Sequence, residues 1–275
     1  MRKTLLLTLA LLVALSSSFL PRAGAQQSSK VSVVHGIPGA TVDVYVNGAL
    51  TLEDFAPKSV AGPLDLPAGN YAIRVFAANA DPQTATPVID VPSAAVPGGA
   101  NVSLVAHLDA NGTPKLSPFV NDVATIAAGQ GKVTIRHTAK VPAVDIVLNG
   151  APVSGLTNLA NGGQGTVTLP VGSYATGIAA TGTTAVLVPA PVTVAEGTNT
   201  IVYAIGALDA NTVDLVVQTI GGLHTAPARV DTGNSGLAAD EPVGIGRLTL
   251  FVLAGGLLLL SGGAFATRRL LPVTR

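Results

Sequence analysis

Two histidine–aspartate pairs are the residues of this sequence whose types and spacing could support a chemical reaction. His35 is followed by Asp43, and His137 is followed at the same interval by Asp145. Histidine titrates near neutral pH and binds metal ions, so either pair could act as an acid–base couple or contribute to a metal site. One histidine and one carboxylate are too few, since even a catalytic zinc site has three protein ligands. We favour a structural role, in which each aspartate binds nearby backbone groups or the histidine itself.

The rest of the sequence gives little support for catalysis. The chain contains no cysteine, which excludes thiol nucleophiles and cysteine metal sites. It also lacks the G-x-S-x-G and S-x-x-K patterns of serine nucleophiles, the D-x-D-x-D-G calcium loop and the H-E-x-x-H zinc motif. We therefore expect no enzyme, no cofactor and no resident metal. A hydrolase or metal-binding protein that uses the repeated pair is the alternative.

Each pair lies in a segment that occurs twice. The stretch "VHGIPGATVDVYVNG" (34–48) corresponds to "RHTAKVPAVDIVLNG" (136–150), and "LPAGNY" (66–71) corresponds to "LPVGSY" (169–174). Matching segments in the same order, at a nearly constant offset, indicate an internal duplication. Units of this length are typical of tandem domains, because solenoid repeats are much shorter.

The pattern within each unit is that of β-strands. Short runs rich in β-branched and aromatic residues, such as "TVDVYV" and "YAIRVFA", are separated by Gly, Pro, Asn and Asp. Asn47-Gly48 and Asn149-Gly150 predict two-residue hairpins, since a type I′ turn needs positive φ at both central residues. The sequence thus predicts an all-β fold with two tandem Ig-like antiparallel β-sandwich domains. The predicted units are a first domain at 26–122, a linker at 123–131 and a second domain at 132–222.

The motif of the first copy continues into a longer pattern, V-H…P…V-D-V-Y-V-N-G followed by L-x-A-G-x-Y. Its residues are Val34, His35, Pro38, Val42, Asp43, Val44, Tyr45, Val46, Asn47 and Gly48, then Leu66, Ala68, Gly69 and Tyr71. This pattern resembles the bacterial surface family catalogued as domain of unknown function 4397, many members of which have one more residue between His and Asp. The second copy keeps fewer of these residues and lacks the tyrosine. The resemblance covers 31–222 and implies an exported β-sandwich, often in tandem and anchored at the cell surface, with no assigned activity.

Both ends of the chain predict a membrane topology. Residues 1–25 have the basic start, the apolar run and the small-x-small end of a signal peptide, with cleavage between Ala25 and Gln26. Residues 248–267 carry no charge over the length that spans a bilayer as a helix. Arginines follow this segment, which places the tail at 268–275 in the cytoplasm. The Gly- and Pro-containing stretch at 223–247 is expected to be a flexible stalk.

The charge of the chain is distributed unevenly. All 15 acidic residues but only eight of the 15 basic residues lie between 26 and 243, so this part carries a net charge of −7. Nucleic-acid binding depends on Lys and Arg that neutralise phosphates, and we expect none here. The expected partners are the membrane, crossed once, and a cell-envelope protein or glycan.

These observations predict a bacterial cell-surface protein, membrane-anchored and extracytoplasmic, with a structural, adhesive or ligand-binding role. A sortase-processed cell-wall protein is a second alternative. The segment "RVDTG" (229–233) lies before the predicted span, where a sorting signal would lie, but it shares only Thr-Gly with the L-P-x-T-G pattern. The final "LPVTR" (271–275) lies on the wrong side of the span for sorting.

Overall fold

The computed structural model describes residues 27–224, which form β-strands and turns without a helix. The predicted signal peptide and its cleavage site, the transmembrane helix, the tail and nearly all of the stalk lie outside these residues. Within 27–224, no helix is long and apolar enough to cross a membrane. The all-β prediction is confirmed for this part of the chain.

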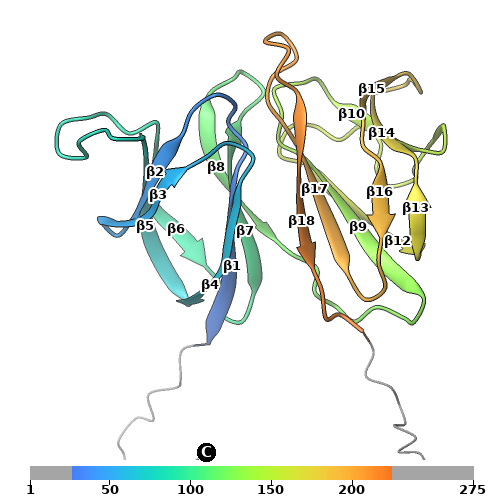
Figure 1. Ribbon diagram of the computed structural model, residues 1–275, viewed down its shortest axis with the longest axis horizontal. Helices are drawn as coiled ribbons and strands as arrows, with labels where there is room; N and C mark the ends of the chain where they lie inside the picture. The colour runs from blue at the N-terminus through green and yellow to red at the C-terminus, as the bar shows by residue number, and fades with distance from the viewer. Residues whose placement is uncertain (1–26, 225–275) are drawn as a thin grey trace, which may run out of the picture. The chain divides into compact units, whose positions relative to one another are not determined.

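The first copy consists of two packed four-stranded sheets, with strand orders β4-β1-β7-β8 and β3-β2-β5-β6. Figure 1 shows these strands in blue to green. The chain moves between the sheets after β1, β3, β4 and β6, so that the first and last strands of the copy lie in the same sheet. The strands are β1 (Ser28–His35), β2 (Val42–Val46), β3 (Ala49–Phe55), β4 (Val60–Pro67), β5 (Gly69–Ala77), β6 (Ile89–Val96), β7 (Asn101–Leu108) and β8 (Pro114–Val120).

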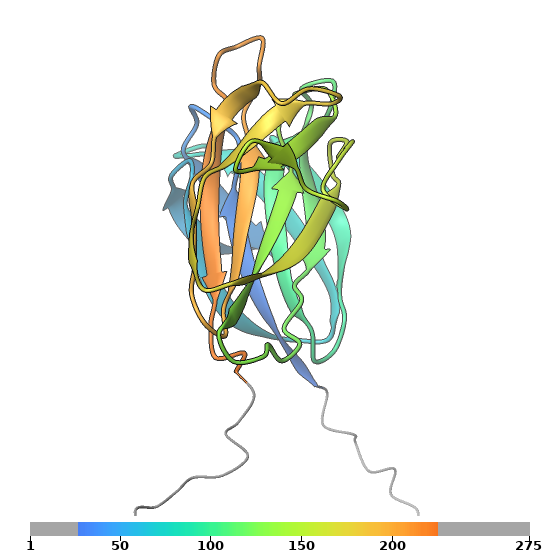
Figure 2. The same ribbon diagram turned by 90° about the vertical axis from the view of Figure 1, so that its right-hand side faces the viewer.

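The second copy repeats this topology with shorter strands in one layer. Its sheets have the orders β12-β9-β17-β18 and β11-β10-β14-β15, and β13 pairs with β16. Figure 2 shows β17 and β18, in orange, side by side. The strands are β9 (Gln130–His137), β10 (Val144–Leu148), β11 (Ala151–Pro152), β12 (Gln164–Pro170), β13 (Gly172–Tyr174), β14 (Thr176–Ala180), β15 (Val186–Pro189), β16 (Val192–Val194), β17 (Asn199–Ile205) and β18 (Asp214–Ile220).

One strand pair in each copy corrects the prediction of purely antiparallel sheets. β1 pairs with β7 in parallel, and β9 pairs with β17 in parallel, while the other paired strands run antiparallel. Parallel neighbours need a long crossover connection. Here the strands that lie between the two parallel partners along the chain form this crossover connection. A local sequence pattern cannot show this pairing, because its partners are far apart along the chain.

The predicted hairpin turns are confirmed. Asn47 and Gly48 have φ values of 51° and 83°, and Asn149 and Gly150 have 49° and 85°. Positive φ at both central residues matches the right-handed twist of the flanking strands. The first turn joins β2 to β3, and the second joins β10 to β11.

The outward faces of the central strands are also buried, which an isolated sandwich would not require. Nearly every residue of β7, β9 and β17 is buried, as in strands covered on both faces. Each copy has its own core, and a third apolar cluster joins the two copies. That cluster contains Val34, Val105 and Phe119 of the first copy and Ile201, Tyr203, Ile205 and Val216 of the second. Sheet β4-β1-β7-β8 therefore packs against sheet β12-β9-β17-β18, within the compact unit that extends to Pro227.

Candidate functional site

His35 lies at the end of β1 and binds the loop that follows it. Its Nε2 donates to the Ala40 carbonyl at 2.8 Å, and its Nδ1 accepts from the Ile37 amide at 3.3 Å. This arrangement selects the neutral imidazole. The ring is buried and packs on the Phe55 ring, with centroids 5.6 Å apart, and its burial lowers the pKa of His35 below 6.5. Since the backbone uses both ring nitrogens, neither offers a lone pair to a metal ion.

Asp43 is buried in β2 and binds the end of β3 and the turn after β5. One carboxylate oxygen accepts from the Asp54 amide at 2.8 Å, and the other accepts from the Asn79 amide at 3.2 Å. Asp54 lies in β3 where its ladder with β2 shifts register, and Asn79 lies in the turn after β5, and both have positive φ. The buried carboxylate supplies acceptors for these two amides. The aspartate therefore binds backbone and not the histidine.

The second copy repeats both arrangements. His137 bonds to the following loop through Nε2 and accepts from a loop amide through Nδ1, and its burial lowers its pKa. The hydrogen bond from the Asn158 amide is the largest cause of the lowered pKa of Asp145. The contacts are Val141 O (3.1 Å), Pro142 O (3.1 Å) and Ala139 N (3.4 Å) for His137, and Asn158 N (2.7 Å) and Gly182 N (2.8 Å) for Asp145.

Neither pair is part of a larger ligand set. Among residues 27–224, no three His, Asp or Glu side chains lie close enough together to hold a metal ion. His107, which has no histidine counterpart in the second copy, bonds to Leu108 O at 2.9 Å and to the Ser117 hydroxyl at 2.9 Å. The arrangement suits both pairs to a structural role, in which their hydrogen bonds fix loops and turns at the ends of the strands.

Asp43→Asn tests this structural role. Asparagine keeps one acceptor oxygen but turns an N–H group toward one of the two backbone amides, which leaves that amide without its acceptor beside a buried side chain. We expect the free energy of unfolding to fall by about 1–3 kcal/mol, measured by urea unfolding of the fragment 26–227. Asp65→Asn is the control, because the Asp65 side chain is 63% exposed in an ion pair with Lys30. A stable Asp43→Asn variant that loses a stoichiometric metal ion would contradict the structural role.

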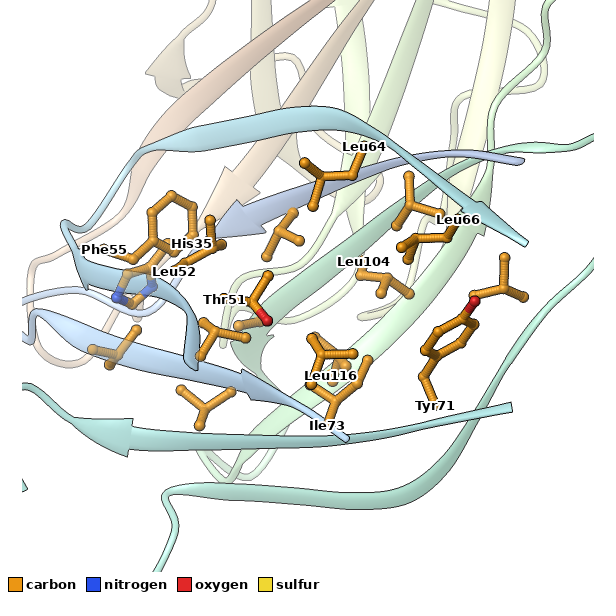
Figure 3. A pocket seen from close by; sticks show the side chains of 18 residues that line it. His35, Thr51, Leu52, Phe55, Leu64, Leu66, Tyr71, Ile73, Leu104 and Leu116 are labelled. Atoms are coloured by element: carbon orange, nitrogen blue, oxygen red, sulfur yellow. The ribbon is translucent and has the colours of Figure 1, made fainter. Parts of the chain in front are cut away.

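A cavity of about 190 Å³ lies between the sheets of the first copy. Figure 3 shows its lining, with Leu64 and Leu66 from β4, Leu52 and Phe55 from β3, and Tyr71 from β5 around one interior. Protein cores contain few voids larger than a water molecule. An unfilled void of about 190 Å³ costs roughly 4–5 kcal/mol at ~24 cal/mol per Å³. The first copy therefore contains an unusually large vacant space for its core.

A buried arginine lies between the two copies. The Arg136 side chain is 1% exposed, and within 27–224 no carboxylate pairs with it. Its Nε donates to Gln164 Oε1 at 2.9 Å, Nη1 to the Tyr203 hydroxyl at 2.8 Å and Nη2 to Asn121 Oδ1 at 2.8 Å. The guanidinium also lies over the Phe119 ring at 4.7 Å. Neutral acceptors and aromatic faces thus replace a counter-charge.

Hydrogen bonds extend this cluster into both copies. The Tyr203 hydroxyl donates to Gln218 Oε1 at 2.5 Å, and the Ser103 hydroxyl donates to the same oxygen at 2.9 Å. Burial lowers the pKa of Arg136 and raises that of Tyr203. Because Ser103 and Asn121 belong to the first copy, the cluster fixes the register of one sheet on the other. An ion pair between Lys58 and Asp214 also joins the copies.

One feature of the sequence indicates this cluster, although it belongs to no motif. At the position of Val34 in the first copy, the second copy has Arg136 within the otherwise apolar run "KVTIRH". A charged residue in a strand that is buried on both faces is rare unless it has partners. The cavity has no such signal, since its lining consists of ordinary core residues.

Comparisons with known proteins give one family match, over part of the chain. No curated protein matches the chain. A solved structure with some likeness is the Bacillus anthracis TIE protein, at 16% sequence identity and a TM-score of 0.19, over 66% of this chain and 33% of that one. The chain thus spans about a third of that protein's length, and so low a TM-score supports no structural or functional argument. Residues 29–147, from β1 to β10, match the model of the family described as "Domain of unknown function (DUF4397)", the family that the motif of the first copy resembles.

Proposed function

We propose that this protein is a membrane-anchored surface protein whose fused sandwiches lie outside the cytoplasm and serve a structural, adhesive or ligand-binding role without catalysis. The observation that carries the proposal is that the histidine and aspartate side chains of both pairs are engaged in hydrogen bonds to the backbone. Both ring nitrogens of His35 and His137 bond to backbone, and Asp43 and Asp145 accept backbone amides. A scaffold that presents loops or faces needs no free reactive group.

The packing of the two copies supports a rigid presenting unit. Independent domains on a flexible linker would expose polar faces to each other. Here the facing sheets share an apolar cluster and a buried arginine. The segment predicted as a linker also packs, because Ile126 is buried and forms a bridge with His224. We also propose the Ig-like class for each sandwich, supported by two packed four-stranded sheets between which the chain crosses.

The topology is tested on whole cells that express the full chain. Protease added outside intact cells should degrade the sandwiches, and removal of the signal should leave Gln26 at the N-terminus. Protection from the protease until the cells are lysed would overturn the surface placement. Mass spectrometry of the C-terminus separates the alternatives, since an end at Thr232 would indicate sortase processing and an intact end would indicate the helical anchor.

A separate measurement tests the enzymatic alternative. We expect metal analysis of the purified fragment 26–227 to give less than one ion per chain, with or without His35→Ala and His137→Ala. Stoichiometric metal that disappears in these variants would favour a hydrolase or metal-binding protein. The protease experiment tests the location of the protein and the metal analysis tests the absence of catalysis, so either part of the proposal can be refuted without the other.

A further inference from the structure

We infer that the cavity of the first sandwich binds a small uncharged apolar molecule or group, of the size of a benzene ring or a short alkyl chain. Its volume of about 190 Å³ exceeds that of an engineered apolar cavity of about 150 Å³ that stays dry and binds benzene. The inference does not depend on where the protein is located, because it rests only on the interior of residues 27–120.

The polar groups at the cavity wall are already used. The Thr51 hydroxyl donates to Ala49 O at 3.1 Å, and the Tyr71 hydroxyl donates to Pro67 O at 2.8 Å. Both nitrogens of His35 bond to backbone. The remaining lining residues are aliphatic or phenylalanine. Water needs two to four polar partners to fill such a space, and a charged ligand needs a counter-charge, so the lining selects a neutral apolar guest.

The two edge strands on one side of the sandwich form its entrance. β3 and β4 are the edges of their respective sheets, and Leu52, Leu64 and Leu66 line the cavity from these edges while remaining partly exposed. β6 and β8 approach each other on the opposite side. The ladders of both edge strands contain register shifts, which loosen the pairing beside the cavity. Figure 3 shows Leu64 and Leu66 on one side of the interior and Leu52 near Phe55.

The second copy shows how the same fold fills this interior. There β11 is only two residues long, and the segment after it places Leu156 and Leu159 in the core. Leu156 packs so closely on β12 that a Cβ at Gly165 would lie 2.2 Å from its Cδ2. A pocket of about 150 Å³ in that copy lies at the His137 end and is lined in part by Asn211. The larger cavity with the almost wholly apolar lining therefore occurs in the first copy, while the second copy keeps a smaller pocket at its His137 end.

The test measures thermal unfolding of the fragment 26–227, which contains all the described strands within one compact unit. Benzene and hexane are the probes, and benzylammonium and hexanoate are their charged analogues. At about ten times Kd, we expect the neutral probes to raise the Tm by roughly 3–5 °C. The charged analogues are expected to give no shift. A folded protein that shows no shift with either neutral probe overturns the inference.

Two matched substitutions locate the binding. Val31 lines the cavity, and Val133 is its buried counterpart in the filled core of the second copy. Val31→Phe should fold normally and abolish the probe shift, because the ring occupies the void, whereas Val133→Phe should lower the Tm and keep the shift. Ala106→Leu fills the cavity from β7 and is the second variant if Val31→Phe does not fold. An undiminished shift in a folded cavity-filling variant overturns the inference.

Discussion

Arg136→Ala is expected to lower the free energy of unfolding by about 2–4 kcal/mol. The substitution removes the donor from two buried acceptors, on Tyr203 and Asn121, and from the exposed Gln164, and it removes the cation from the Phe119 ring. Unpaired buried polar groups cost their full desolvation free energy. Since domains are stable by only about 5–15 kcal/mol, this loss should separate the copies or unfold the protein at moderate urea concentrations. Urea unfolding of the fragment 26–227, followed by circular dichroism, measures it.

Arg74→Ala is the control for this prediction. Arg74 also lies over an aromatic ring, at 4.9 Å from the Phe76 centroid, but its side chain is only partly buried. We expect a loss below about 1 kcal/mol. Arg136→Met keeps most of the side-chain volume but has no N–H donors. If this variant is as stable as the original protein, the stability lost in Arg136→Ala is due to packing and not to the hydrogen bonds. A change of less than about 1 kcal/mol in Arg136→Ala would show that the buried cluster does not hold the copies together.

Acidification is expected to destabilise the protein strongly below about pH 6.5. His35, His107 and His137 are at most 1% exposed, and burial lowers the pKa of each. Near pH 6 the unfolded chain therefore binds more protons than the folded one, so stability rises with pH. The stability is fully present above about pH 7.5 and is lost as pH falls toward the folded pKa values. Each histidine contributes a slope of up to about 1.4 kcal/mol per pH unit.

Urea unfolding at intervals between pH 8 and pH 5 measures this slope. Substitution of one histidine by glutamine should reduce the slope by about a third, whatever it does to the stability at pH 8. The lowered pKa of Asp145, caused first by the hydrogen bond from Asn158 N, adds a further loss only below about pH 4. A free energy of unfolding that stays constant from pH 8 to pH 5 would contradict the neutral, buried state of these rings.

The role of the His–Asp pairs can be predicted from the sequence, but their hydrogen-bond partners cannot. The sequence indicates that the pair recurs with a hairpin and that no third ligand recurs with it. This is enough to favour a structural role. It cannot identify the partners, because Asp43 binds amides at positions 54 and 79. The position of these amides depends on how β3 and β5 fold back beside β2.

The duplication likewise predicts two similar folds but not their differences. Val34 and Arg136 occupy equivalent positions on outward faces, and a sandwich considered alone would leave both exposed. The packing of one copy on the other buries them. Similarly, the short strand β11 and the longer β3 both follow an Asn-Gly turn. Only the path of the chain beyond these strands places leucines in the middle of one core and leaves a large apolar cavity in the other.

The sequence by itself determined the strands, the hairpin turns and the duplication, and its first motif indicated the family whose model matches residues 29–147. Strand alternation and turn residues act over a few neighbouring positions, so they can be read directly from the residue order. The tertiary structure alone decided the parallel pairs, the fused copies, the buried Arg136 and the cavity. Each of these depends on contacts between segments far apart along the chain, and on the shape that their side chains leave between them.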